Sequence, residues 1–314
     1  MKSIADDRVH TMDDKDFKSM VKSISRSLSI TFYLLPKQQQ KPILIAYLLA
    51  KLGDSIVDAY GETAIKRSKA FIALQNSFQN AINGGGSVEI SDLTLLKFES
   101  EAELHLAKKL KSILAYYIEL SDTQRGHVEK VVKCILLKQK EELDSLNETG
   151  VYRLTSMEEL GSYVYQMSGV VGEFWTDISL EGENYSKLER ATLCKLGRDY
   201  GNALHYLNIL RDVKQDFDNQ RFYVPVDNEL SEAAIYENGQ KLIHKIELGL
   251  QSGLKYAKSL NNYKLRIGIS MPARIGLLYL SKMRHLTWEE FKNKKIITRN
   301  EVYKLLVSSL FKSR

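Results

Sequence analysis

The scarcity of proline and glycine is the feature that most constrains the fold of this chain of 314 residues. Four prolines and eighteen glycines are few for this length, and this favours long uninterrupted helices over a fold of short strands and turns. The clearest loop, NGGGS at residues 83–87, is followed directly by further helical pattern. The sequence therefore predicts an all-α protein that forms a single domain over residues 1–314.

Helical patterns divide the chain into segments whose ends are marked by polar residues. Ser121 with Gln124, and Ser156 with Glu159, have the spacing of capping boxes that open helices. Pro42 suits the first turn of a helix. The expected helices cover about 13–24, 42–59, 62–82, 121–143, 156–178, 186–217, 231–260, 263–285 and 299–312.

Composition and charge narrow the function classes. Hydrophobic residues make up 44% and charged residues 27%, as in ordinary soluble globular proteins. The formal net charge of +6 suits an anionic ligand such as a phosphate as well as a solvated surface. No basic stripe with interleaved aromatic residues is present, which argues against a nucleic-acid binder.

The termini and the cysteines indicate a cytoplasmic protein. The first residues, MKSIADDRVHTMDDKDF, are charged and lack the apolar core of a signal peptide. The longest apolar run is about eight residues, which is too short to cross a bilayer. Cys134 and Cys194 cannot form a disulfide framework and do not have metal-ligand spacing, so they suit a reducing compartment.

Two pairs of aspartates interrupt apolar segments. Asp54 and Asp58 stand in KLGDSIVDAY, and Asp212 and Asp216 stand in NILRDVKQDF. A separation of four residues puts both carboxylates of a pair on one face of a helix, about one turn apart. Carboxylates in an apolar helix are costly unless cations compensate them.

Two such pairs that face one another would form a set of oxygen ligands for a hard cation. Mg²⁺ in particular combines a few carboxylates with substrate phosphates. The alternative is that each pair is a solvated helix end, compensated by the basic residue that precedes it, Lys51 or Arg211. The spacing alone leaves both interpretations open.

Four segments occur in a fixed order along the chain. They are SISRSLSITFYLLP, IAYLLAKLGDSIVDAYG, YVYQMSGVVGEFWTDI and YGNALHYLNILRDVKQDFDNQRFYVP. Together they resemble the squalene/phytoene synthase family of head-to-head prenyl transferases, over about residues 20–310. The forms of the second and third segments are closer to squalene-type bacterial members than to plant-type phytoene synthases.

The resemblance implies a fold, a reaction and its cofactors. The implied fold is the prenyl-synthase helical bundle with a central cavity, and the implied substrates are two prenyl diphosphates, expected to be farnesyl diphosphate. They would join with Mg²⁺ through a cyclopropyl diphosphate intermediate, and NADPH would then reduce the rearranged cation to squalene. A lipid product also implies contact with a membrane surface. No partner protein is implied.

Two alternatives stay open beside a squalene synthase. One is a carotenoid-type synthase that gives dehydrosqualene or phytoene without NADPH. The other is a catalytically silent relative that acts as an assembly factor, and the presence of all four aspartates argues against it.

The resemblance also assigns roles to individual residues. Tyr163 could stabilise a carbocation through its ring face or relay a proton through its hydroxyl. Without the resemblance, Tyr47 and Tyr163 are also typical of a packed core, and the glycines of GVVGEFW are typical of helix packing. The implied magnesium ligands are Asp54, Asp58, Asp212 and Asp216. The implied diphosphate contacts are Ser25, Arg26, Ser27, Lys51, His205 and Arg211. The implied catalytic residues are Tyr47, Tyr163 and Asn208; Gly169, Val171 and Gly172 would line the prenyl cavity; and Lys294, Lys295 and Arg299 would contact a phosphate or NADPH.

Three positions depart from the family pattern. Lys51 stands where the family usually has arginine, so the charge is kept but the bidentate fork is lost. His205 replaces a usual glutamine, which makes the charge at this position dependent on pH. Leu28 replaces a usual phenylalanine. These departures bear on rate and substrate more than on the class of reaction.

Overall fold

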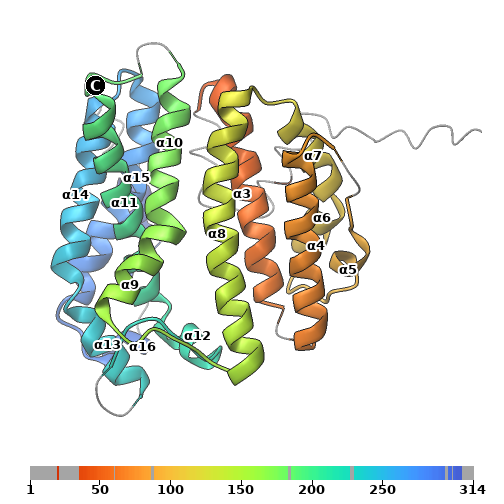
Figure 1. Cartoon of the computed structure of the whole chain (residues 1–314). Helices are drawn as coiled ribbons and strands as arrows, with labels where there is room; N and C mark the ends of the chain where they lie inside the picture. The colour runs from red at the N-terminus through yellow and green to blue at the C-terminus, as the bar shows by residue number, and fades with distance from the viewer. Residues whose placement is uncertain are drawn as a thin grey trace, which may run out of the picture. The chain divides into compact units, whose positions relative to one another are not determined.

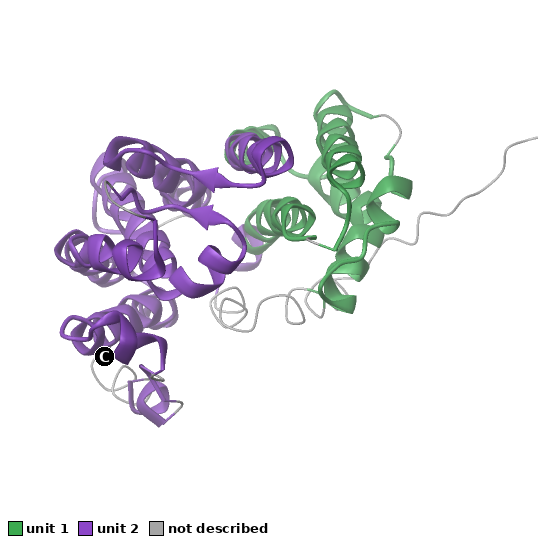
Figure 2. Ribbon diagram, turned by 90° about the horizontal axis from the view of Figure 1, so that it is seen from below, with its two compact units in different colours: residues 1–32, 40–132 green, residues 33–39, 133–314 purple. Residues whose placement is uncertain are grey.

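The computed structural model describes residues 20, 35–59, 61–85, 88–182, 185–226, 230–293, 296–298 and 300–305. The chain divides into two compact units, coloured separately in Figure 2. Unit 1 comprises Met1–Phe32 and Gln40–Val132, and unit 2 comprises Tyr33–Gln39 and Lys133–Arg314. The single domain over residues 1–314 stays a prediction.

The described part of unit 1 is helical. Its elements are α3 (Lys37–Val57), which begins in unit 2, α4 (Ala64–Ile82), α5 (Ser91–Thr94), α6 (Glu101–Lys108), α7 (Leu110–Ile118) and the first part of α8 (Asp122–Thr149), shown in Figure 1. Leu48, Leu49, Leu52 and Ile56 recur on one face of α3 and are fully buried, so α3 supplies much of the core of this unit. The helices between residues 91 and 118 were not among those expected from the sequence.

Two helix starts show how local signals set the boundaries in unit 1. α3 begins at Lys37, five residues before Pro42, because a proline inside a helix removes one hydrogen bond but does not exclude a preceding turn. α8 begins where expected: the Gln124 backbone N–H donates to Ser121 Oγ at 3.2 Å. α8 continues to Thr149, beyond the expected end near residue 143.

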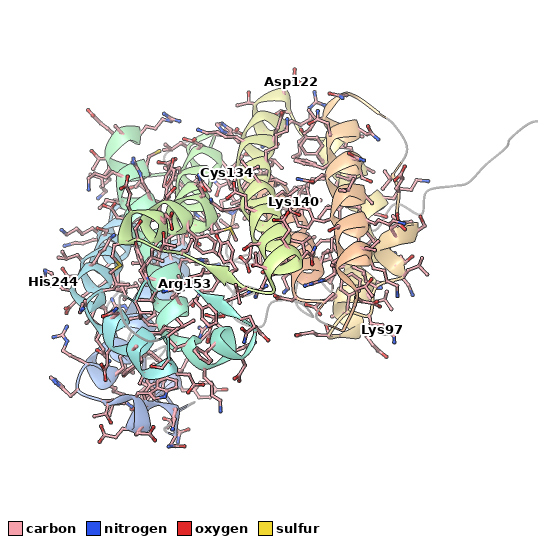
Figure 3. The ribbon with its side chains drawn as sticks, turned by 60° about the horizontal axis from the view of Figure 1, so that its bottom comes forward. Lys97, Asp122, Cys134, Lys140, Arg153 and His244 are labelled. Carbon is pink, nitrogen blue, oxygen red and sulfur yellow. The ribbon has the colours of Figure 1, made fainter. Side chains whose placement is uncertain are left out.

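Unit 2 is built around α11, which packs against α10, η1, α14 and α15. Cys134 and Lys140 mark the part of α8 that belongs to this unit, and Arg153 lies on its first strand (Figure 3). The remaining elements are β1 (Tyr152–Arg153), α9 (Met157–Val164), the π-helical turn η1 (Tyr165–Gly169), α10 (Val170–Leu180), α11 (Arg190–Arg211), α12 (Val213–Asp218), β2 (Arg221–Phe222), α13 (Glu232–Gln240), α14 (Ile243–Ser259), α15 (Tyr263–Met283) and α16 (Trp288–Lys292).

The structure corrects three helix predictions in unit 2. The helix expected over 186–217 is interrupted at Asp212, and the helix expected over 231–260 is two helices, α13 and α14. The helix expected over 156–178 passes through the π-helical turn η1. β1 and β2 form a parallel pair in which Tyr152 lies opposite Arg221, a pairing that no local pattern indicated. The all-α fold class is confirmed.

Small residues let η1 and α10 approach α11 closely. A Cβ atom added at Gly172 would lie 2.0 Å from the carbonyl oxygen of Gly197, and one added at Gly201 would lie 2.3 Å from that of Ser168. The backbone of α11 is therefore in direct contact with those of η1 and α10. Across the described ranges, no helix combines the length and the apolarity needed to cross a membrane.

Candidate functional site

The first aspartate pair lies at the end of α3 in unit 1. The Asp58 backbone N–H donates to the Asp54 carbonyl oxygen at 2.9 Å, which confirms that the two residues are one helical turn apart. The Asp54 side chain is 46% exposed and Asp58 is partly exposed. The two carboxylates are therefore partly exposed on α3 and are not part of the buried core of unit 1.

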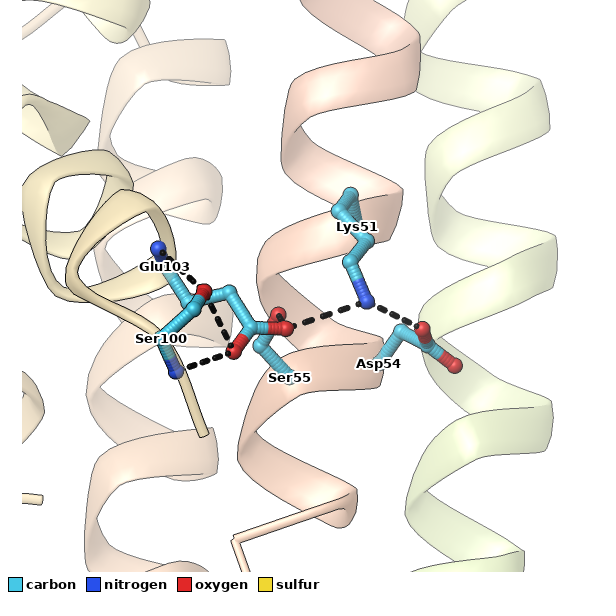
Figure 4. Close-up of polar contacts among 5 residues, drawn as sticks. All are labelled: Lys51, Asp54, Ser55, Ser100 and Glu103. Atoms are coloured by element: carbon cyan, nitrogen blue, oxygen red, sulfur yellow. Dashed lines mark hydrogen bonds and ion pairs between the residues drawn. The ribbon is translucent and has the colours of Figure 1, made fainter. Parts of the chain in front are cut away.

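Lys51 joins this pair to α6. Its Nζ donates to Asp54 Oδ2 at 2.8 Å and lies 3.3 Å from Glu103 Oε1, as Figure 4 shows. Burial lowers the pKa of Lys51, but the charge and hydrogen bond of Asp54, together with the charges of Asp58 and Glu103, outweigh burial and raise it. Lys51 is therefore a fixed ammonium ion among three carboxylates, and not a side chain directed into solvent.

Glu103 is held in place by the start of α6. Its Oε2 accepts the Ser100 backbone N–H at 3.1 Å, while its Oε1 accepts the Ser55 hydroxyl at 3.0 Å. The sequence reading omitted Glu103, although Ser100 and Glu103 have the spacing of a capping box that would have marked this helix start.

The second aspartate pair lies in unit 2, at the junction of α11 and α12. The Asp216 backbone N–H donates to the Asp212 carbonyl oxygen at 2.9 Å, and that of Asp212 donates to the Asn208 carbonyl oxygen at 2.9 Å. The turn spacing predicted for Asn208, Asp212 and Asp216 is therefore confirmed, even though the α-helix is interrupted at Asp212 (φ −100°, ψ 12°).

Arg211 forms an ion pair with Asp212 of the second aspartate pair, just as Lys51 does with Asp54 of the first. Its Nε and a terminal nitrogen donate to the two Asp212 carboxylate oxygens at 2.7 and 2.5 Å. The hydrogen bond with Asp212 raises the pKa of Arg211, and the charges of Asp212 and Asp216 add to this effect. Each aspartate pair thus shares one cation, and each lies in its own unit.

The donor chemistry of the two pairs fits a hard cation. Carboxylate oxygens that are partly exposed are the ligands that Mg²⁺ prefers, and the neighbouring Lys51 and Arg211 can contact phosphate oxygens. Within the part of the chain that the structure describes, no group of three or more His, Cys, Asp or Glu residues is placed to hold a metal. Each pair by itself supplies only two carboxylates. Magnesium binding by the four aspartates therefore stays a prediction.

Tyr163 lies in a buried group of side chains in unit 2, which we name the Glu142 cluster and define as Glu142, Tyr163, Arg221 and Tyr223. The hydroxyls of Tyr163 and Tyr223 donate to Glu142 Oε2 and Oε1, each at 3.2 Å. Arg221 Nε lies 2.6 Å from Glu142 Oε1. Burial and the charge of Glu142 raise the pKa of Tyr163 and of Tyr223 well above the usual value, so both phenols stay protonated at neutral pH.

His205 lies beside the Glu142 cluster. The centroids of the His205 and Tyr163 rings are 5.5 Å apart, and the rings are in a T-shaped arrangement. His205 Nδ1 is 2.9 Å from Ser168 Oγ. The structure thus brings together Tyr163 and His205, which the sequence reading had assigned to different roles.

The other sequence-predicted residues fall into three groups. Asn208 is exposed on α11, and Tyr47 is partly buried on α3, two turns before Asp54. Val171 is 36% exposed, whereas Gly169 and Gly172 face Asn202 and Gly197 of α11 and serve helix packing; their role in a prenyl cavity stays a prediction. Ser25, Arg26, Ser27, Lys294, Lys295 and Arg299 lie outside the described residues.

The sequence reading missed Glu142 and Arg221. Along α8 the buried residues include Val128, Val132 and Ile135, and then Gln139 and Glu142 continue the same helical stripe. A carboxylate in an apolar stripe is the pattern that singles out Asp54, but at Glu142 the stripe runs into KQKEELD, whose many charged residues indicate a solvated helix instead.

Comparison with known proteins agrees with these features. The sequence model of the squalene/phytoene synthase family matches residues 21–300. A phytoene synthase of Thermus thermophilus is 28% identical over 218 residues, which are 68% of this chain and 61% of that enzyme. A squalene synthase of Schizosaccharomyces pombe is 20% identical over 205 residues, which are 64% of this chain and 42% of that enzyme. The matched region therefore spans less than two thirds of either relative.

Solved structures share the fold. A structure of TcSQS with the ligand BPH1237 superposes with a TM-score of 0.73 at 14% identity and covers 94% of this chain and 85% of its own. A dehydrosqualene synthase with a ligand gives a TM-score of 0.63 at 18% identity and covers 96% of this chain and 98% of its own. Because the family model matches most of the sequence and the fold agrees, this chain belongs to the squalene/phytoene synthase family.

Proposed function

We propose that this protein joins two prenyl diphosphates head to head, with farnesyl diphosphate as the substrate and squalene or a related C30 compound as the product. Members of its family are prenyltransferases and use a divalent metal. The observation that carries the proposal is the matched construction of the two aspartate pairs. Each pair is spaced by one helical turn and shares one cation, Lys51 in unit 1 and Arg211 in unit 2.

The chain's own residues would act mainly on the diphosphates. Asp54, Asp58, Asp212 and Asp216 would hold Mg²⁺, which neutralises the diphosphate leaving group when bound. Lys51 and Arg211 would donate to phosphate oxygens, and they would thereby favour ionisation to an allylic cation.

The alternative within the family is a synthase that ends at dehydrosqualene or phytoene without NADPH. Relatives named phytoene synthase and squalene synthase are both similar to this chain, which supports either product. The silent relative is disfavoured because all four aspartates are present and each pair has helical spacing. A lipid product also leads us to propose contact with a membrane surface.

One assay tests the reaction and its metal dependence. The purified protein is incubated with farnesyl or geranylgeranyl diphosphate and Mg²⁺, with and without NADPH, and the products are identified by mass. We expect turnover that stops when EDTA is in excess and returns when Mg²⁺ is restored, because the carboxylates cannot stabilise an anionic leaving group without a cation. Turnover that persists in EDTA would contradict the metal site. A product that is the same with and without NADPH would favour the carotenoid-type synthase.

A second prediction concerns Lys51. Lys51→Arg keeps the positive charge and can grip two phosphate oxygens, so we expect unchanged or higher kcat/KM. Lys51→Gln removes one charge-assisted contact and is expected to lower kcat/KM by the equivalent of about 1–3 kcal/mol. Lys66→Gln is the matched control. Lys66 also pairs with a nearby carboxylate, that of Glu62, but its side chain is largely exposed. A Lys51→Gln enzyme as active as the parent would remove Lys51 from the site.

A further inference from the structure

The carboxylate of Glu142 is a buried junction between three segments of unit 2. Glu142 belongs to α8 and is only 4% exposed. It accepts hydrogen bonds from Tyr163 of α9 and from Tyr223, which follows β2, and it pairs with Arg221 of β2. One side chain thus connects α8, α9 and the end of β2.

Stability alone does not account for this arrangement. A buried carboxylate loses its hydration, and an ion pair with a buried partner such as Arg221, which is 8% exposed, regains about as much as it costs. Apolar side chains of similar volume would fill the same space at equal or greater stability. A role in orienting the neighbouring tyrosines explains the buried charge better.

The hydrogen bond to Glu142 fixes the position and the electronic state of Tyr163. The Tyr163 ring is stacked on Tyr223, with centroids 5.0 Å apart and planes at 29°, and meets His205 on another side. Since its hydroxyl donates to a carboxylate of another helix, the Tyr163 ring is held in one orientation. A phenol that donates to an anion is also more electron-rich, which strengthens the attraction between its ring and a cation.

We infer that Glu142 is a positioning residue that holds Tyr163 in one orientation and enriches its ring for the stabilisation of a carbocation. This inference rests on the proposed function, and it concerns the ring-face role of Tyr163. Arg221 is the charged partner of Glu142, and Tyr223 supports the Tyr163 ring from one side.

Glu142→Gln is the first test, because it keeps the size of the side chain and removes its charge. We expect kcat for prenyl diphosphate turnover to fall by about tenfold to a hundredfold, with KM within about twofold, since orientation and cation stabilisation act on the reacting state. Glu141→Gln is the matched control: Glu141 is the adjacent residue, 48% exposed and paired with Lys138, and its variant should match the parent. A Glu142→Gln enzyme with the parent's kcat would overturn the inference.

Two double variants separate positioning from stability. If Glu142 acts through Tyr163, the loss of kcat in Glu142→Gln combined with Tyr163→Phe should not exceed that of Tyr163→Phe alone. Glu142→Gln combined with Arg221→Gln removes both buried charges, so thermal stability should recover relative to Glu142→Gln while kcat stays low. Recovery of kcat together with stability would show that Glu142 is merely structural.

A spectroscopic measurement tests the contact without using activity. With tyrosine labelled by ¹³C at Cζ, the Tyr163 resonance is assigned by its absence in Tyr163→Phe. We expect this resonance to shift in Glu142→Gln and to stay in place in Glu141→Gln. If the parent protein turns over no prenyl diphosphate, the proposed function fails, and the resonance still reports on Glu142 and Tyr163. An unshifted resonance in Glu142→Gln would overturn the inference whatever the activity.

Discussion

Replacing Asp212 or Asp54 by asparagine is expected to lower prenyl diphosphate turnover by at least about a hundredfold. Each substitution keeps the size of the side chain but removes one of the charges proposed to hold the metal, and several kcal/mol of leaving-group stabilisation depend on that metal. The loss should appear mainly in kcat, measured at saturating Mg²⁺ and substrate, because the interaction strengthens as the leaving group gains charge.

The folded state should tolerate these substitutions. The Asp54 and Asp212 side chains are 46% and 32% exposed, and partly exposed ion pairs contribute at most about 1 kcal/mol. Asp122→Asn and Asp218→Asn are matched controls, since Asp122 pairs with Arg125 at a spacing of three residues and Asp218 is exposed on α12. Both controls should keep full activity. Unfolding of Asp54→Asn or Asp212→Asn would show that these aspartates are structural.

Gly172→Ala is expected to destabilise the protein by about 3 kcal/mol or more. The added methyl group would lie 2.0 Å from the carbonyl oxygen of Gly197, and because the obstacle is backbone, α10 and α11 must move apart for it to fit. A lower midpoint of thermal unfolding, by about 5–10 °C, should be measurable by circular dichroism.

Gly126→Ala provides the opposite expectation within the same protein. Gly126 lies in α8, is exposed, and has nothing within 4 Å of an added Cβ atom. Alanine at such a helical position should stabilise the fold by about 0.5–1 kcal/mol. If Gly172→Ala is as stable as Gly126→Ala, the close packing of α10 against α11 is wrong.

Much of the fold could be predicted from the sequence because its signals are local. Few prolines and glycines indicated helices, and Ser121 and Ser156 marked two helix starts. The four-residue spacing of the aspartates predicted that each pair lies one turn apart, and the backbone hydrogen bonds confirm it. The interruption at Asp212 could not be predicted in this way. The i to i+4 backbone hydrogen bonds continue on both sides of Asp212, so the four-residue spacing of the sequence is the same with and without the interruption.

The site was harder to predict because part of it depends on contacts between distant residues. Glu142 stands in KQKEELD, which has the composition of a solvated helix, and its burial follows from Tyr163, Arg221 and Tyr223. The parallel pairing of β1 with β2 gave no local sign, since each strand has two residues. Lys51 was predicted to face Asp54, but its second partner, Glu103, comes from a helix that was not expected.

The long sequence separations within the Glu142 cluster have a consequence for the order of folding. Tyr223 lies 81 residues from Glu142, and β1 and β2 close a loop of similar length. Helices form from local contacts within about a microsecond, whereas contacts that close long loops must first overcome the entropy of closure. Unit 2 should therefore become helical before this cluster assembles. During refolding, far-UV circular dichroism should recover ahead of the near-UV signal of the buried tyrosines, and catalytic activity should return with the tyrosines.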